Sequence, residues 1–142
     1  PAPIENVWNF ISSPQNLKKI TPAYMGFTVT SKLESKKMYE GMIITYKVKP
    51  LLGIPINWMT EITHVKDKEY FVDEQRSGPY KLWHHEHLLQ SIEGGTLMTD
   101  IVTYIPPFGI IGVFANGLFI KKQLQKIFDY RTIAVELKFG KF

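Results

Sequence analysis

A run of twenty residues without one charged side chain, residues 101–120, constrains the fold of this chain more than any other segment. Its length and neutrality match a bilayer-spanning helix, because roughly 20 apolar residues cross the hydrocarbon layer. However, Pro106 and Pro107 interrupt it, Gly109 and Gly112 follow, and its first residues alternate with the two-residue period of a strand. We therefore expect a strand, a turn and the start of a helix.

The helix predicted after this turn is the longest element in the chain. On a helical wheel its apolar side chains fall in one stripe, and its charged and amide side chains lie roughly opposite. The stripe consists of Val113, Ile120, Leu124, Ile127, Phe128 and Val135, and Gly117 also lies in it. This pattern predicts one amphipathic helix of about 25 residues that ends near the C-terminus.

The composition limits the classes of protein that this chain can represent. Its 142 residues are enough for one domain that buries about two thirds of its unfolded surface without disulfides. The absence of cysteine excludes disulfides, thiolate metal ligands and cysteine nucleophiles. The sequence starts without a secretory leader pattern, so we expect a cytoplasmic protein. The net charge of +4 comes from scattered lysines, which excludes a nucleic-acid footprint and leaves peripheral contact with anionic lipid open.

Two short helices are predicted near the N-terminus, followed by a sheet. Residues 3–11 carry apolar side chains at helical spacing, and a second helix starts at Pro14 with Ser13 as its N-cap. From Phe27 onward the period changes to two, which predicts strands joined by short turns. The six predicted strands are residues 27–34, 42–49, 56–66, 70–76, 81–92 and 96–105.

These elements together predict an α+β fold. Successive strands with short connections form an antiparallel meander, and one long helix is available to cover it. A curved antiparallel sheet wrapped around a long C-terminal helix, with two short helices near the N-terminus, is the helix-grip arrangement. Such a fold usually opens with a strand before its first short helix. We therefore expect residues 1–142 to form a single domain that lacks its first β-strand.

Several segments resemble one known family. Residues 3–10 (PIENVWNF), 14–17 (PQNL) and 20–22 (ITP) are similar to the opening of bacterial START-like (SRPBCC) proteins of the polyketide cyclase/dehydrase and lipid-transport superfamily. Segments that resemble one subgroup are residues 71–75 (FVDEQ), 78–80 (GPY), 83–87 (WHHEH) and 127–131 (IFDYR). Members of that subgroup are described as ligand-binding, and some are labelled cell-division inhibitors. The superfamily includes carriers, cyclases and hydroxylase subunits, so the resemblance implies the fold and leaves the chemistry open.

The densest group of titratable residues is the sequence HHEH at residues 84–87. Strand alternation places Trp83, His85 and His87 on one face of the sheet. Two histidines at this spacing can share a metal ion with a carboxylate, but a bound metal needs three or four ligands at defined distances. We expect hydrogen bonds along the sheet instead, with no metal and no cofactor.

The position of the turn decides which residues face these histidines. A two-residue turn at Gly94-Gly95 predicts that Tyr104, Val102 and Asp100 lie opposite His85, His87 and Leu89. A shift by one residue would send Asp100 to the other face. In this register, the candidates for acid/base catalysis are His85, Asp100 and Tyr104.

Arg131 falls within the apolar stripe of the last helix. A buried guanidinium must be paired, so Asp73, Glu74, Asp100 or a carboxylate of a ligand is its expected partner. The alternative is that its aliphatic stem packs on the core while its charged head reaches water.

Aromatic and methionine side chains are more abundant than one thin core layer requires, which indicates a lined cavity beneath the helix, although a filled core would use the same residues. The predicted apolar lining is Trp58, Trp83, Val102, Tyr104, Leu124 and Phe128. The predicted polar anchors are His85, His87, Asp100 and Arg131. Two apolar segments, residues 51–55 and 106–112, either gate this cavity or pack on each other.

The predicted function is binding of a small hydrophobic or amphipathic molecule, such as a lipid, isoprenoid or polyketide-like compound. Two alternatives stay open. A cyclase or dehydratase would use His and Asp side chains within the cavity. A protein-interaction accessory factor would instead have a filled core and an exposed apolar patch around residues 51–55 and 108–111. We expect ligand binding without catalysis.

Overall fold

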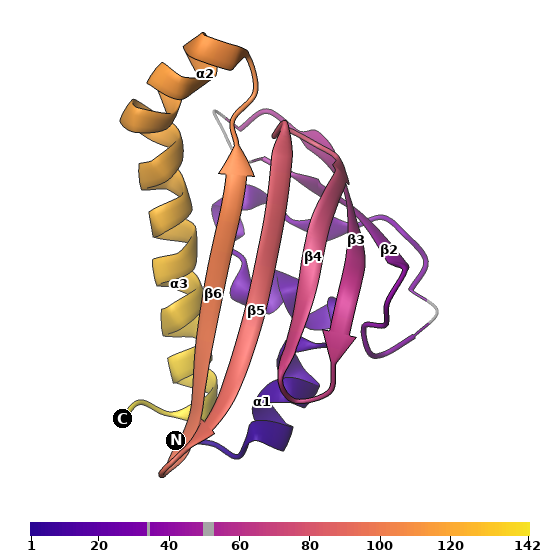
Figure 1. Ribbon diagram of the computed structural model, residues 1–142, viewed down its shortest axis with the longest axis vertical. Helices are drawn as coiled ribbons and strands as arrows, with labels where there is room; N and C mark the ends of the chain where they lie inside the picture. The colour runs from indigo at the N-terminus through magenta and orange to yellow at the C-terminus, as the bar shows by residue number, and fades with distance from the viewer. Residues whose placement is uncertain (34, 50–52) are drawn as a thin grey trace.

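A computed structural model describes residues 1–33, 35–49 and 53–142. Six strands form one antiparallel sheet whose spatial order follows the chain, and a long C-terminal helix runs beside its last strand (Figure 1). This confirms the predicted helix-grip arrangement. The strands are β1 (Thr28–Val29), β2 (Met42–Val48), β3 (Ile56–Lys66), β4 (Tyr70–Ser77), β5 (Leu82–Ile92) and β6 (Gly95–Ile105). Residues 51 and 52 of the expected apolar gate lie outside the described residues.

The first strand is much shorter than the predicted residues 27–34. After β1 the chain leaves the regular ladder, and the N–H groups of Thr30 and Ser31 both donate to the carbonyl of Thr45. The side chain of Ser31 accepts the N–H of Thr45 at 3.1 Å, which replaces a strand-to-strand hydrogen bond. Residue 34 lies outside the described residues. Local side-chain bonding of this kind competes with strand pairing and ends β1 early.

The curvature of the sheet is concentrated where β3 pairs with β4. The register shifts between Met59 and Thr60 and again between Ile62 and His64. Such irregularities bend a strand and increase its twist. The bend turns one face of β3 and β4 towards the helices, which gives the sheet its concave side.

The hairpin between β5 and β6 turns one residue earlier than predicted. Ile92 pairs with Gly95, so Glu93 and Gly94 form the turn. Gly94 has a φ of 81°, which suits the second position of a two-residue turn that needs a left-handed residue. Gly95 serves a different purpose, because a Cβ there would collide with Pro1 and the ring of Phe142. The pairing consequently shifts by two residues, and each side chain keeps its predicted face.

The N-terminal segment forms α1 (Ile4–Ile11) and two 3₁₀ turns, η1 (Pro14–Ile20) and η2 (Ala23–Met25). The expected second helix is therefore present as η1. Ser13 occupies its N-cap position, but the predicted side-chain cap is wrong, because Ser13 makes no capping hydrogen bond in the structure. Asn16 fixes the bend instead, by donating from its side chain to the carbonyl of Phe10 at 2.9 Å.

The C-terminal helical region consists of α2 (Gly109–Ala115), the π-helical turn η3 (Asn116–Ile120) and α3 (Lys121–Phe139). It begins four residues before the predicted start of the apolar stripe. Ile120 and Leu124 are buried, while Ile127, Phe128 and Val135 are half-buried. The side chain of Val113 lies outside what the structure describes. Within the described ranges, no helix combines the length and apolar character needed to cross a bilayer.

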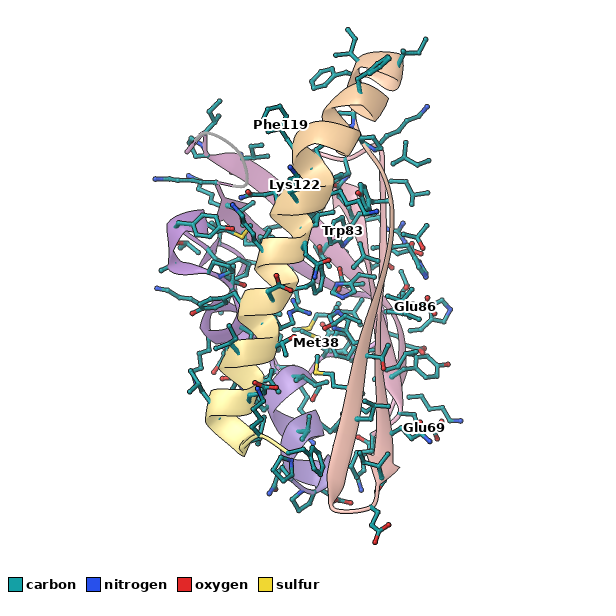
Figure 2. All side chains as sticks on the ribbon, turned by 90° about the vertical axis from the view of Figure 1, so that its left-hand side faces the viewer. Met38, Glu69, Trp83, Glu86, Phe119 and Lys122 are labelled. Carbon is teal, nitrogen blue, oxygen red and sulfur yellow. The ribbon has the colours of Figure 1, made fainter. Side chains whose placement is uncertain are left out.

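Two apolar clusters of described residues lie on the concave side of the sheet. One joins α1 to the sheet through Trp8, Ile11, Ile44, Ile62 and Phe71, among others. The other lies nearer α2 and includes Phe27, Val48, Trp58, Trp83 and Leu124. Figure 2 shows Trp83 on the helix side of the sheet and Glu86 on the opposite side. The inward positions of β5 run from Trp83 to Leu89, so His85 and His87 lie between the two clusters.

Replacing a core residue of the first cluster should reduce stability strongly. Ile62 is 1% exposed, so Ile62→Ala should lower the free energy of unfolding by about 2–5 kcal/mol in a urea titration. The matched control is Ile43→Ala on the neighbouring strand, where the side chain is 44% exposed and the change should stay within about 0.5 kcal/mol. Equal losses in the two variants would contradict this description of the core.

Candidate functional site

Five titratable or charged side chains from four elements meet beneath α3. Asp73 lies on β4, His85 and His87 on β5, Asp100 on β6, and Arg131 on α3. The strand register brings them together, because Asp73 pairs with His85 and His87 pairs with Asp100. We refer to these five residues as the polar cluster.

Each histidine of the polar cluster bridges both carboxylates. His85 places Nδ1 3.3 Å from Asp73 Oδ2 and Nε2 2.9 Å from Asp100 Oδ1. His87 places Nε2 2.7 Å from Asp73 Oδ2 and Nδ1 3.0 Å from Asp100 Oδ1. The two ring centroids are 3.7 Å apart, and both histidine side chains are 4% exposed. The cluster is thus a closed ring of alternating imidazole and carboxylate groups inside the protein.

The two carboxylates raise the pKa of His85 and so favour its protonated form. Burial alone would lower the pKa of His85, but the charge of Asp73 and the hydrogen bonds to Asp100 and Asp73 outweigh burial and raise it. A neutral imidazole has one N–H, whereas an imidazolium donates from both ring nitrogens. Both nitrogens of His85 face carboxylate oxygens, so His85 has no free nitrogen that could act as a base.

Both carboxylates of the cluster are held as anions. Burial would raise the pKa of Asp73, but the charge of His85 and hydrogen bonds from both histidines hold this pKa well below its ordinary value. Burial would likewise raise the pKa of Asp100. Here the charge of Arg131, with Nη1 3.0 Å from Asp100 Oδ1, and hydrogen bonds from the two histidines lower the pKa strongly.

Arg131 connects α3 to the sheet through Asp100, one of the three carboxylates considered from the sequence. Glu74, another of the three, accepts a hydrogen bond from Arg76 instead. The Arg131 side chain is 12% exposed, so its charged head does not extend freely into water. It lies over the ring of Phe128, with 5.1 Å from its central carbon to the ring centroid. Its Nε is buried and has no hydrogen-bond partner among the described residues.

Asp73, His85 and His87 are the residues of the described chain that come nearest to a metal-binding group, with ligand atoms within 4.8 Å of one another. Zinc binds such atoms at about 2.0–2.2 Å. Here the same atoms bond to each other, and a metal would have to displace the proton that His85 shares with Asp73. The geometry therefore favours a hydrogen-bonded cluster over a metal centre.

The polar cluster contributes to the wall of a cavity of about 120 Å³ between the sheet, η1 and α3. Much of the remaining wall is aromatic, with Tyr46, Trp58, Tyr80 and Trp83 in successive ring contact at centroid distances of 4.9–5.9 Å. The structure places seven of the predicted lining residues in this wall: Trp58, Trp83, His85, His87, Leu124, Phe128 and Arg131.

The other three predicted lining residues, Asp100, Val102 and Tyr104, face a groove of about 440 Å³ between β6 and α3. The reason is that β6 is an edge strand, so its inward side chains lie at the groove between the sheet and α3. Tyr104 pairs with Trp83, while Val102 pairs with His85. The two-residue register shift therefore separates Tyr104 from His85, the proposed acid/base partner.

Sequence reasoning did not place Tyr46, Asp73 or Tyr80 in the cavity wall. Alternation along β4 could have indicated Asp73, because it shares the inward face with Phe71. Tyr80 is held by a link that alternation cannot predict. The side chain of Gln75 donates to the Tyr80 carbonyl at 2.6 Å and accepts the Tyr80 N–H at 3.1 Å.

The tyrosine hydroxyls of the wall remain protonated. Burial, together with the charge of Asp73, raises the pKa of Tyr46, whose hydroxyl lies 3.1 Å from Thr60 Oγ1. Burial also raises the pKa of Tyr80 to about 12. The cavity therefore presents neutral phenols and aromatic faces on one side and the polar cluster on the other.

Comparison with known proteins supports the fold. A model of the family described as "Polyketide cyclase / dehydrase and lipid transport" matches residues 1–129. Among solved structures, TTHA0849 from Thermus thermophilus aligns with 96% of this chain and 88% of its own, at a TM-score of 0.66 and 19% identity. Protein Ms6760 from Mycobacterium smegmatis aligns with 96% of this chain and 85% of its own, at a TM-score of 0.65 and 19% identity. At these identities the likeness shows the fold alone. None of the curated proteins matches the chain.

The polar cluster predicts a stability maximum at mildly acidic pH. Asp73 and Asp100 have lowered pKa values, so their contribution is present above the unfolded value of 3.8 and is lost as the pH falls. His85 has a raised pKa, so its contribution is complete below the unfolded value of 6.5 and is lost as the pH rises through the folded pKa. Thermal unfolding should therefore show the highest Tm between about pH 4 and 6.5.

Two histidine variants test whether the fall in Tm above pH 6.5 comes from His85 or from histidines in general. His85→Gln should remove most of the fall in Tm above pH 6.5, because the group that loses its proton is gone. His64→Gln serves as the control, since His64 is exposed on β3. The assignment of this pH dependence to His85 would be contradicted by a wild-type Tm that stays level above pH 6.5. It would also be contradicted if Tm depended on pH as little in His64→Gln as in His85→Gln.

Proposed function

The chain belongs to the polyketide cyclase/dehydrase and lipid transport family, and we propose that it binds a small hydrophobic or amphipathic molecule between the sheet and α3. The observation that carries this proposal is the aromatic cavity with charged groups on one side. Apolar walls with a few convergent polar groups are typical of small-molecule sites. The apolar surface would hold the body of the ligand, and the polar groups would orient it.

The volume of the cavity limits the size of the ligand. An apolar cavity of about 150 Å³ takes up a guest of the size of benzene, whereas pockets for drug-sized ligands span roughly 300–1,000 Å³. The cavity of this protein measures about 120 Å³. A single ring or a short branched chain therefore fits without rearrangement, while a longer lipid requires α3 to move outwards over the groove beside β6.

Two buried donors favour a ligand that carries an acceptor. Trp58 Nε1 and Arg131 Nε are both buried, and neither has a hydrogen-bond partner among the described residues. Both residues contribute to the cavity wall. A buried donor without a partner costs about 1–3 kcal/mol, and a ligand oxygen that reaches it would remove this cost. An amphipathic molecule with a carbonyl, ether or hydroxyl oxygen thus suits this site better than a pure hydrocarbon.

Catalysis of the cyclase or dehydratase type is the second candidate function. It is favoured by one observation, that His85 lies within hydrogen-bonding distance of two carboxylates and beside the cavity. In this geometry both ring nitrogens of His85 already face carboxylates, so His85 cannot exchange a proton with a substrate while the polar cluster is closed. A reaction that starts by proton abstraction would need the polar cluster to open first. Binding alone requires no such opening, so it is the function that the geometry supports better.

Native mass spectrometry tests the binding proposal directly. Freshly purified protein should carry a small organic molecule at one copy per chain, and this added mass should disappear under denaturing conditions. A Trp83→Ala variant changes the aromatic wall and should lose the added mass, while Tyr39→Ala, an exposed residue away from the cavity, should retain it. Repeated preparations that carry no added mass, combined with no binding in the calorimetric experiment below, would refute the proposal.

A matched pair of probes tests the role of Trp58. Acetophenone and ethylbenzene have similar size and shape, but only acetophenone carries an acceptor oxygen. Isothermal titration calorimetry should show tighter binding of acetophenone to the wild type. Trp58→Phe removes the donor and should weaken acetophenone binding by about 3–10-fold, while ethylbenzene binding should change little. Equal weakening for both probes would indicate lost packing and would contradict the hydrogen bond.

A further inference from the structure

The helix α2 lies at the end of the molecule where the chain passes from β6 into the C-terminal helical region (Figure 1). Large apolar side chains on and beside α2 form an exposed surface, and the least exposed of them, Phe119, is 67% exposed. We call this surface the apolar tip; it consists of Phe108, Ile110, Ile111, Phe114 and Phe119. Isolated apolar residues are common on protein surfaces, but a contiguous group of this kind marks an interaction site.

The backbone at the start of the apolar tip is strained. Phe108 has a φ of 66° and Gly109 a φ of 53°, so two successive residues adopt the left-handed conformation. Glycine tolerates this conformation, whereas a bulky residue such as phenylalanine rarely adopts it. Phe108 is also 82% exposed, so its side chain gains no packing within this chain that would offset the strain. Strain of this kind is concentrated at functional sites.

Basic residues lie at the same end of the molecule as the apolar tip. The sequence contains no Asp or Glu between residues 101 and 128, and the exposed Lys121 and Lys122 follow the tip directly. Figure 2 shows Lys122 close to Phe119 on the C-terminal helical region, which continues above them. The exposed Lys81 joins the same end of the sheet, because its N–H donates to the carbonyl of Ile105. We call Lys81, Lys121 and Lys122 the basic collar.

We propose that the apolar tip inserts into the surface of an anionic lipid bilayer and that the basic collar contacts the lipid headgroups. Large apolar side chains flanked by lysines are the composition that interfacial membrane anchors use. The charge distribution favours this partner over a second copy of the chain, because a contact between two apolar tips would bring two basic collars together. With seven residues, α2 lies in the interface and does not cross the bilayer. This contact does not depend on the ligand proposed above.

Vesicle co-sedimentation with the full chain tests this docking. The protein should bind vesicles of phosphatidylcholine mixed with phosphatidylglycerol and should bind phosphatidylcholine vesicles at least tenfold more weakly, with binding that falls as salt is added. The double variant Phe108→Glu/Ile111→Glu should bind the mixed vesicles at least tenfold more weakly than the wild type. Lys121→Ala/Lys122→Ala should weaken binding roughly fivefold for each lysine removed.

Leu137→Glu provides the matched control, because Leu137 is 84% exposed near the far end of α3. This variant should bind vesicles as the wild type does, and circular dichroism should show that all variants retain the wild-type Tm. Failure of the wild type to bind the mixed vesicles would overturn the proposal, as would an equal loss in the control. A dimer in solution that Phe108→Glu/Ile111→Glu dissociates, without vesicle binding by the wild type, would identify a second copy as the partner and would likewise overturn it.

Discussion

The ion pair between Arg131 and Asp100 is the interaction on which the relation of helix, sheet and cavity depends. Leu124 is the only buried side chain of α3, all of whose residues are described, and the other apolar contacts of this helix with the core are made by half-buried residues such as Val135 and Phe139. Arg131 adds a charged contact to the edge strand β6, at 3.0 Å. A buried pair of this kind stabilises little in total because both groups lose their hydration, but removal of one partner leaves an uncompensated charge. The pair therefore fixes where α3 lies more than it adds stability.

The same pair is linked to the rest of the polar cluster. Asp100 accepts hydrogen bonds from both histidines, and these histidines contact Asp73 on β4. Any displacement of Arg131 would also change the electrostatic environment of His85 and His87. The helix that closes the cavity and the charges that face the cavity are thus parts of one network. A ligand that moves α3 would alter the polar cluster, even without direct contact with the histidines.

This arrangement explains why a cavity can persist beneath the helix. The aromatic side of the wall is rigid, because Gln75 holds Tyr80 by two hydrogen bonds and Tyr80 contacts both Trp58 and Trp83. The side formed by α3 contacts the core through Leu124, through half-buried residues such as Ile127, and through Arg131. A wall with few fully buried contacts, opposite a wall of packed rings, can admit guests of different size. The closed polar cluster, with its carboxylates and His85 already paired, also suits orientation of a ligand better than proton abstraction.

The sequence predicted the fold because apolar periodicity is a local property that survives small errors in boundaries. The position of His85 and His87 on the inward face follows from alternation and was correctly predicted. The partner of each histidine depended on whether the turn used Gly94-Gly95 or Glu93-Gly94. Those two possibilities differ only in which glycine needs a left-handed φ and which needs space beside Pro1. That distinction depends on contacts far apart in the chain, which one sequence does not display.

The choice of Asp100 as the partner of Arg131 also depends on contacts between residues far apart in the chain. From the sequence, Asp73, Glu74 and Asp100 were equivalent carboxylates on two predicted strands. The structure separates them because Arg76 pairs with Glu74 and the histidines surround Asp73. Asp100 alone lies on the strand next to α3. Asp100 is therefore the partner of Arg131 because it lies on the edge strand. The strand order determines this position, and the residue type alone does not indicate it.

The π-helical turn explains both a failure of the helical wheel and the origin of the external apolar surface. A wheel assumes about 3.6 residues per turn throughout, and on that basis Gly117 belongs to the buried stripe. A π-helical turn carries additional backbone within one turn and rotates the preceding segment relative to the following one. From Ile120 onward the stripe faces the core, whereas Gly117 and Phe114 are exposed. One amphipathic pattern is thereby divided into two surfaces, one that covers the cavity and one that projects from the end of the molecule.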